Sequence, residues 1–146
     1  GTYTMISAKK VNGAWNIYST LNDGKSHTET IVLSTAKENY ANYSHLGAGN
    51  DLKDATKNGF ILGTTNFNGY VAWDRQCLNC ILQYGGTNYP LEWTGNRQSV
   101  ICNKCKRVYS LENGTITSGG QGKEDKMLMQ YRVTYTGIGS VLTVGN

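Results

Sequence analysis

Two Cys-x-x-Cys pairs constrain this chain more than any other feature of its sequence. The first pair reads C-L-N-C and the second C-N-K-C, twenty-one residues lie between them, and together they contain all four cysteines. A tight turn in each spacer presents both sulfurs of a pair to one point, and two facing turns place four thiolates at the corners of a tetrahedron. We therefore predict a metal site formed by Cys77, Cys80, Cys102 and Cys105.

Disulfides are the rival use of the same sulfurs. A Cys-x-x-Cys pair can close on itself as a redox disulfide, and a long-range pair such as Cys77 with Cys102 is also geometrically feasible. The redox state of the compartment decides between thiolate ligands and disulfides. Both uses stay open at this point.

The composition favours short strands joined by turns. The 146 residues include 18 glycines, 10 tyrosines and a single proline, which suits many short strands better than a helical bundle. A chain of this length is most simply one domain. We expect a single domain over 1–146, with a metal-binding lobe at about 74–110 inserted at the base of a β-barrel. No apolar run approaches the roughly 20 residues of a membrane span.

Turn signals separate the segments that we expect to be strands. Asn68-Gly69 and Asn113-Gly114 are typical of hairpin turns, and Thr35 with Glu38 resembles the capping box of a short helix over Ala36–Tyr43. Closely spaced strands predict an all-β antiparallel barrel or sandwich. The predicted strands cover Gly13–Ser19, Glu29–Ser34, 60–65, 70–73, 81–84, 89–93, 98–101, 108–111, 115–117, 127–135 and 140–144.

The second half of the chain, about 59–146, resembles the Rieske-type domain family. The segments that carry the resemblance are YVAWDRQC, VICNKC, KRVYSLENGTITSGG, MLMQYRVTYTG and VLTV. Five residues fall where the family has its aromatic residue, leucine, turn glycine, loop glycine and tyrosine: Tyr109, Leu111, Gly114, Gly119 and Tyr131. The resemblance implies a small antiparallel barrel or sandwich that carries a two-knuckle metal lobe. In that family two cysteines and two histidines hold a [2Fe–2S] cluster. The spacing of the cysteines in this chain is equally that of a rubredoxin-like iron site or a zinc ribbon.

This sequence departs from the family at the ligands themselves. Cys80 and Cys105 stand near the positions of the two family histidines, and the first knuckle is one residue longer. Gly120 replaces the proline of the family's loop, and Arg107 replaces a serine that often hydrogen-bonds the cluster. Four thiolates suit a closed structural zinc site. We favour zinc, with a [2Fe–2S] cluster or a single iron as alternatives that the spacing does not separate.

Charged residues beside the cysteines have two interpretations each. Lys104, Lys106 and Arg107 either offset the negative charge of four thiolates or are exposed turn residues. Asp74 and Arg75 either pair with each other or bond to the backbone at the first knuckle.

We expect structural roles, rather than ligand roles, for the aromatic residues around the lobe and for the two histidines. We expect Tyr109 to pack in the core rather than donate to sulfur, and Trp73 and Trp93 to form the core or rim of the lobe. The two histidines, His27 and His45, lie far upstream in polar surroundings, so we expect exposed loop residues rather than ligands.

Nothing in the sequence favours catalysis, so we expect a protein that is not an enzyme. No nucleophile–base arrangement is suggested, and Glu124 and Asp125 are interpreted as solvated loop charges. The favoured function is a non-catalytic binding module with a structural zinc and an unidentified protein or redox partner. The alternatives are an electron-transfer protein with an all-cysteine iron site, a zinc-ribbon nucleic-acid binder, and a module in which disulfides replace the metal.

Charge and the N-terminus add two weaker expectations. A net charge of +4 with only 16% charged residues, scattered along the chain, argues against nucleic acid as the partner. Gly1 resembles a residue left after tag cleavage, and together with the Rieske resemblance this suggests an exported or periplasmic protein whose targeting segment has been removed.

Overall fold

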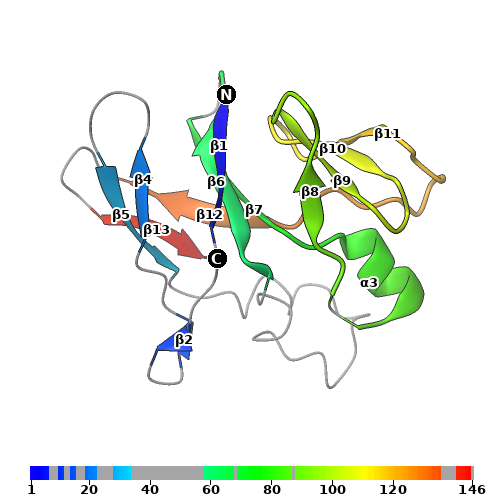
Figure 1. Cartoon of the computed structure of the whole chain (residues 1–146), viewed down its shortest axis with the longest axis horizontal. Coiled ribbons are helices and arrows are strands. Elements are labelled where there is room, and N and C mark those ends of the chain that lie inside the picture. The colour runs from blue at the N-terminus through cyan, green and yellow to red at the C-terminus, as the bar shows by residue number, and fades with distance from the viewer. Residues whose placement is uncertain are drawn as a thin grey trace.

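The protein consists mainly of β-strands arranged in two main sheets. The computed structural model describes residues 1–6, 10–11, 14–15, 19–22, 28–33, 58–67, 69–86, 88–135 and 141–145. Figure 1 shows the larger sheet on the left and in the centre, and the smaller sheet with the helix α3 (Leu78–Tyr84) on the right. The predicted all-β class is therefore confirmed.

The larger sheet has seven strands in the order β1-β6-β7-β12-β13-β5-β4. All neighbouring strands in it are antiparallel except β13 and β5, which are parallel. Its strands, in sheet order, are β1 (Thr2–Ile6), β6 (Phe60–Thr64), β7 (Tyr70–Asp74), β12 (Gln130–Thr134), β13 (Val141–Gly145), β5 (Thr28–Leu33) and β4 (Ser19–Asn22).

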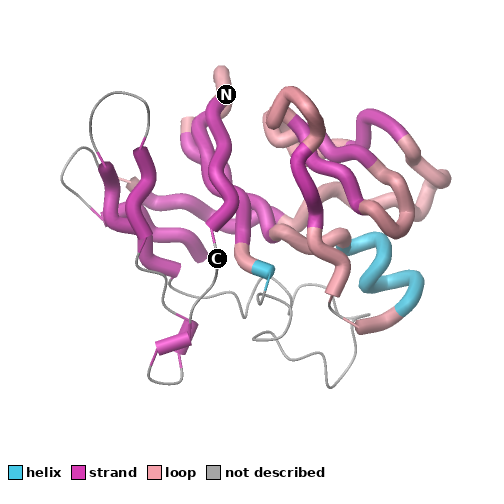
Figure 2. Tube along the Cα trace, viewed as in Figure 1, coloured by secondary structure: helices cyan, strands magenta, loops and turns pink. Residues whose placement is uncertain are grey.

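The smaller sheet has four antiparallel strands in the order β11-β10-β9-β8, so each strand pairs with its neighbour in the chain. These are β8 (Leu91–Trp93), β9 (Ser99–Cys102), β10 (Val108–Ser110) and β11 (Ile116–Ser118). A separate two-stranded ribbon joins β2 (Lys10–Val11) to β3 (Ala14–Trp15). In Figure 2 the helix lies directly beside the four-stranded sheet, and we call helix and sheet together the lobe, residues 77–118.

One buried core joins the lobe to the larger sheet. Trp73 of β7 is 2% exposed and donates from its indole nitrogen to the carbonyl oxygen of Leu111 at 3.0 Å. The same cluster contains Tyr3 and Ile61 from the larger sheet, and Val100 from the lobe. It also contains three of the cysteines. The metal-ligand candidates are therefore placed on a shared hydrophobic base rather than on a surface loop.

The structure corrects several predicted elements. The segment 81–84, predicted as a strand, is the second half of α3, and the predicted strand 127–135 is regular only from Gln130. Strand β1 was not predicted. The Gly13–Ser19 prediction coincides with β3 and the start of β4, and residues 16–18 lie outside the described residues. The predicted helix Ala36–Tyr43 lies outside the described residues as well.

The remaining predicted strands have counterparts at nearly the predicted bounds, including Glu29–Ser34, which coincides with β5. The Asn68-Gly69 signal also marks a turn: β6 and β7 pair antiparallel across it, and Gly69 has φ 69°. Among the described helices, none is long and apolar enough to cross a membrane.

Candidate metal centre

Each cysteine pair is carried by a backbone turn that faces the other turn. Cys77 immediately precedes α3 and Cys80 lies in its first turn, where the Ile81 N–H donates to the Cys77 carbonyl at 3.2 Å. Cys102 ends β9, and the Lys106 N–H donates to its carbonyl at 2.7 Å. We call these the first knuckle (77–80) and the second knuckle (102–105).

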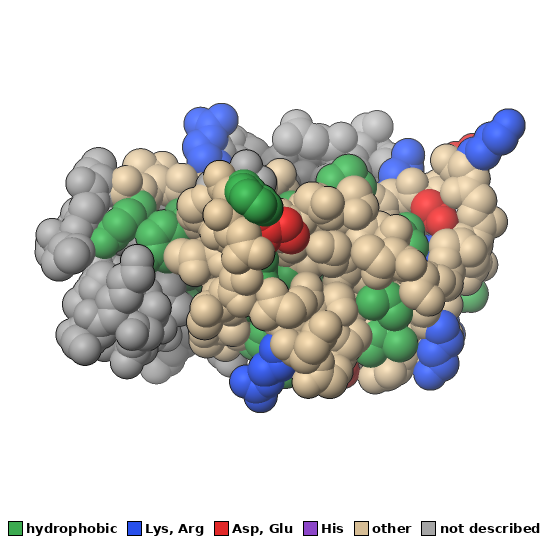
Figure 3. All heavy atoms as spheres, turned by 90° about the horizontal axis from the view of Figure 1, so that it is seen from above, with side chains coloured by type: hydrophobic (Ala, Val, Ile, Leu, Met, Phe, Trp, Pro, Cys, Tyr) green, Lys and Arg blue, Asp and Glu red, His purple; other side chains and the backbone are tan. Residues whose placement is uncertain are grey.

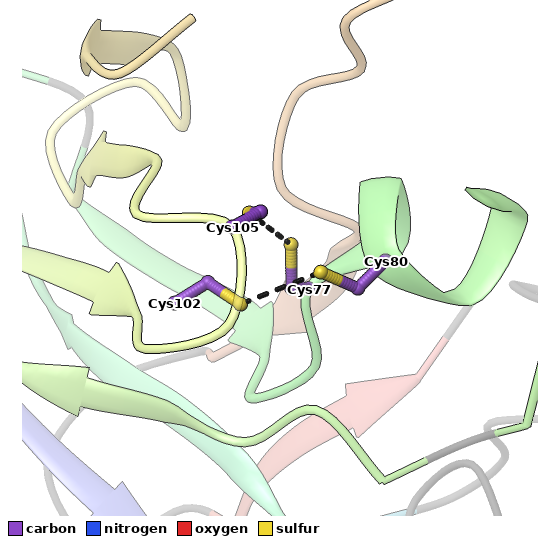
Figure 4. A group of neighbouring side chains, drawn as sticks. All are labelled: Cys77, Cys80, Cys102 and Cys105. Carbon is purple, nitrogen blue, oxygen red and sulfur yellow. Dashed lines mark hydrogen bonds between the residues drawn. The ribbon is translucent and has the colours of Figure 1, made fainter. Parts of the chain in front are cut away.

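The four cysteine sulfurs converge on one point. All four Sγ atoms lie within 4.8 Å of one another. Figure 4 shows the two close cross-knuckle pairs, Cys77 with Cys105 at 3.7 Å and Cys80 with Cys102 at 3.6 Å. An ion with four sulfurs at about 2.3 Å holds them about 3.8 Å apart at tetrahedral corners. The donor set and its spacing therefore fit one tetrahedral metal ion.

Backbone donors within each turn favour the thiolate state of these sulfurs, whereas burial opposes it. Cys77, Cys80 and Cys102 are buried and Cys105 is half-buried. The Cys80 N–H donates to the sulfur of Cys77, and the N–H groups of Cys105 and Lys104 donate to the sulfur of Cys102. Such N–H···S bonds stabilise negative sulfur. These N–H groups offset part of the negative charge of the thiolates, and they belong to the same turns as the sulfurs.

In the metal-free protein these contacts separate the cysteine pKa values. Interaction with the Cys77 thiol lowers the pKa of Cys102 to about 4, although burial opposes the shift. The pKa of Cys77 is raised, first by the same interaction with Cys102 and then by burial. Burial, followed by Cys102, raises the pKa of Cys80 to about 12. Four sulfurs this close cannot all be ionised without a cation among them.

Tyr109 contacts the centre directly, which corrects the expectation that it only packs in the core. Its side chain is buried, and its hydroxyl lies 3.1 Å from the Cys77 sulfur. The side-chain nitrogen of Asn79 donates to the same hydroxyl at 2.8 Å. Burial, followed by the charge of Cys77, raises the pKa of Tyr109. The phenol is thus neutral and can donate to sulfur.

Asn79 is a site residue that sequence reasoning missed. Besides Tyr109, its amide nitrogen donates to the Lys126 carbonyl at 2.9 Å, and its oxygen accepts the Lys126 N–H at 2.8 Å. It is buried although it is polar. The sequence contains no distinguishing signal for this role, because Asn103 in the second spacer is exposed whereas Asn79 is buried and must find partners.

Arg107 and its two lysine neighbours differ in exposure. Arg107 is 4% exposed and is bound to Asp125, whereas Lys104 and Lys106 are exposed. The Lys104 ammonium lies 4.4 Å from the ring centre of Tyr84. Of the three cations, only Arg107 thus enters the interior of the site.

Asp125 was expected to be a solvated loop charge, but its carboxylate is bound by protein groups. Its Oδ1 accepts from Arg107, and its Oδ2 accepts the backbone N–H groups of Gln121 and Gly122. The Gln121 N–H, then Arg107 and then the Gly122 N–H, hold the pKa of Asp125 below its usual value, although burial opposes the shift. The carboxylate therefore joins the 119–125 loop to the second knuckle. Glu124 beside it is exposed, as expected.

Asp74 and Arg75 have different partners. Asp74 accepts a hydrogen bond from the Tyr131 hydroxyl. Arg75 donates to the Leu91 carbonyl and to the Glu92 carboxylate, both at 2.8 Å. The Arg75 side chain therefore bonds to the backbone of β8 and not to that of the first knuckle, and its bonds join the end of β7 to β8.

A pocket of about 570 Å³ opens beside the Arg107–Asp125 pair. It lies between α3, which contributes Asn79, Leu82 and Gln83, and the segment 121–126. Two polar groups in its lining, Asn79 and Asp125, bond to neighbouring protein groups.

Trp93, expected in the core or at the rim, is half-buried with Arg97 above its ring. His27 and His45 lie outside the described residues.

Comparison with models of protein families, with curated proteins and with solved structures found no match to this chain. The Rieske resemblance therefore stays a prediction from the sequence. The four-cysteine centre stands on its own geometry.

Proposed function

We propose that this protein is a non-catalytic binding module of Rieske-like type, in which one structural zinc ion replaces the iron–sulfur cluster. The observation that carries the proposal is the convergence of four cysteine sulfurs within 4.8 Å, from two turns that face each other. Four thiolates fill every position of a tetrahedral zinc ion and leave none for water or substrate. A closed site of this kind stabilises structure instead of performing chemistry.

The spacing of the sulfurs favours one ion over a dinuclear cluster. In a [2Fe–2S] cluster the four cysteines are divided between two irons. Bridging sulfides keep the irons apart, so sulfurs on different irons must lie further apart than sulfurs on the same iron. Here the two close pairs are almost equal, at 3.6 and 3.7 Å, and no sulfur lies beyond 4.8 Å from another.

The surroundings of the centre support a structural role. In the pocket beside it, the buried Arg107 is already bound to Asp125, one of the two carboxylates of the described lining. The described lining of the pocket contains no histidine, cysteine or serine. On the face in Figure 3, Lys and Arg side chains stand apart from one another and form no continuous basic stripe. Nucleic-acid binding requires such a stripe.

Metal analysis of protein purified without added metal tests the proposal, together with an absorption spectrum and a free-thiol count. We expect one equivalent of zinc and a colourless solution. One iron with thiolate charge-transfer bands would replace zinc by a mononuclear electron-transfer site. Two irons with sulfide would overturn the single-ion geometry. No metal and no free thiols would show that disulfides occupy the site.

A matched set of variants tests the ligand assignment. Cys102→Ser removes one thiolate from a closed site, so we expect loss of most of the bound metal and a lower melting temperature. His27→Ala and His45→Ala serve as controls and are expected to retain full metal content. Loss of metal in either histidine variant would contradict the four-sulfur assignment.

A further inference from the structure

Arg107 carries a positive charge into the interior two residues after Cys105. Its Nε and Nη2 atoms donate to Oδ1 of Asp125 at 3.1 and 2.8 Å. Its third nitrogen, Nη1, is buried and has no hydrogen-bond partner among the described residues. Buried guanidinium N–H groups in native structures nearly always have an acceptor. This unused donor therefore indicates an acceptor supplied by the completed site.

The metal centre supplies both the acceptor and the reason for the charge. Four thiolates around a divalent cation leave about two negative charges in a buried place, and buried charge requires compensation. The Arg107 guanidinium interacts with the Cys105 side chain. Lys104 and Lys106, the other cations beside the second knuckle, are exposed to solvent.

We propose that Arg107 is a positioning residue of the metal centre, which donates from Nη1 to the metal-bound sulfur of Cys105 and offsets part of the thiolate charge. This inference rests on the proposed metal site. It makes the centre asymmetric, because the 3.7 Å pair of Cys77 and Cys105 receives side-chain donors from Tyr109 and Arg107.

The 119–125 loop holds the guanidinium in this position. Oδ2 of Asp125 accepts the Gln121 N–H at 2.7 Å and the Gly122 N–H at 3.3 Å, while Oδ1 binds Arg107. At the start of the loop, Gly119 has φ 74°, and a Cβ there would lie 2.3 Å from the Lys106 carbonyl oxygen. The loop thus packs backbone to backbone on Lys106, the residue after the second knuckle, and only glycine permits this approach.

The test compares Arg107→Gln and Arg107→Lys with Lys106→Gln, which removes the same charge from the adjacent exposed residue. Zn²⁺ affinity is measured by competition with a chromophoric chelator, and the sulfur-to-metal charge-transfer band is recorded with Co²⁺. For Arg107→Gln we expect roughly 10–100-fold weaker Zn²⁺ binding, the usual effect of losing an outer hydrogen bond to a ligand. The Co²⁺ band should move to lower energy, because the sulfur loses a donor. Arg107→Lys should fall between wild type and Arg107→Gln.

Lys106→Gln is expected to keep Zn²⁺ affinity within about twofold, because an exposed charge is screened by solvent. Equal affinity and equal band position in Arg107→Gln and Lys106→Gln would overturn the inference. If Arg107→Gln does not fold, Asp125→Asn takes its place with the same readouts, because it releases the guanidinium without removing it. A wild-type protein that binds neither Zn²⁺ nor Co²⁺ through four thiolates would instead overturn the metal site itself.

Discussion

The Tyr109 hydroxyl lies 3.1 Å from the Cys77 sulfur, and the Asn79 amide donates to that hydroxyl from the other side. A phenol that accepts from an amide still has its own hydrogen to donate. When Cys77 is a thiolate it has no proton to donate, so Asn79 donates to Tyr109 and Tyr109 donates to Cys77. This chain of donors joins β10 to the first knuckle.

Tyr109→Phe removes the hydroxyl and keeps the buried ring. We expect the free energy of unfolding of the metal-loaded protein to fall by about 1–3 kcal/mol, because Asn79 loses an acceptor and Cys77 loses a donor. Urea denaturation measures the change. Tyr84→Phe is the control. The Tyr84 side chain is 52% exposed, and removal of its hydroxyl should lower the free energy of unfolding by less than about 0.5 kcal/mol. Equal effects in the two variants would show that the Tyr109 hydroxyl does not stabilise the centre.

Gly114→Ala should be more destabilising than Gly69→Ala. Both glycines have left-handed φ, 76° and 69°, so alanine strains each backbone by about 1–2 kcal/mol. At Gly114, however, the new Cβ would lie 2.7 and 2.8 Å from two ring atoms of Trp73, whereas at Gly69 it would meet nothing within 4 Å. Overpacking adds about 1–3 kcal/mol. Thermal denaturation of the two variants measures the difference, and identical losses would contradict the contact with Trp73.

Glu92→Ala and Arg75→Ala should differ although they break the same ion pair. The side chains are 48% and 25% exposed, so the pair itself contributes at most about 1 kcal/mol. Arg75→Ala also removes the bond to the Leu91 carbonyl, which adds about 0.5–1.5 kcal/mol. Denaturation at low and high salt separates the two parts, since only the ion pair is screened. A larger loss in Glu92→Ala than in Arg75→Ala would contradict this division.

Removal of the metal should affect the lobe more than the larger sheet. A strong chelator frees the two knuckles, which connect α3 to β9 and β10, whereas β1, β6 and β7 pair without any cysteine. We expect faster amide hydrogen exchange across 77–118 and little change across 60–64 and 70–74. Exchange measured by mass spectrometry with and without chelator gives the comparison. A uniform increase along the chain would mean that the metal holds both sheets together.

Features with local physical causes could be predicted from the sequence. The Asn113-Gly114 dipeptide indicates a turn because glycine adopts positive φ without cost, and the structure has φ 76° at Gly114. The two-residue spacers likewise hold the sulfurs of each pair close together, and the presence of two such pairs predicts a four-sulfur cluster. The four sulfurs do cluster as predicted.

Features that depend on distant partners could not be predicted in the same way. The run 81–84 is too short for its apolar residues to distinguish a strand from a helix, and it continues the helical turn that Cys77 begins. Leu78 and Ile81 then face Met129, a contact across about fifty residues. The burial of Arg107 depends on Asp125, eighteen residues further on, so exposed and buried interpretations were equally consistent with the sequence.

The two sheets differ in the length of chain that each must close. Every strand pair of the four-stranded sheet joins consecutive strands within 91–118, whereas the larger sheet pairs Thr2 with Thr64 and Leu33 with Val144. Short loops close at lower entropic cost and sooner than long ones. During synthesis, the knuckles can therefore bind their ion once Cys105 has emerged, before the strand that completes the larger sheet exists. Pulse-labelled hydrogen exchange during refolding should show protection at 99–110 before 141–145, and the reverse order would contradict it. The metal would then act as a folding nucleus for the lobe, which forms before the larger sheet is complete.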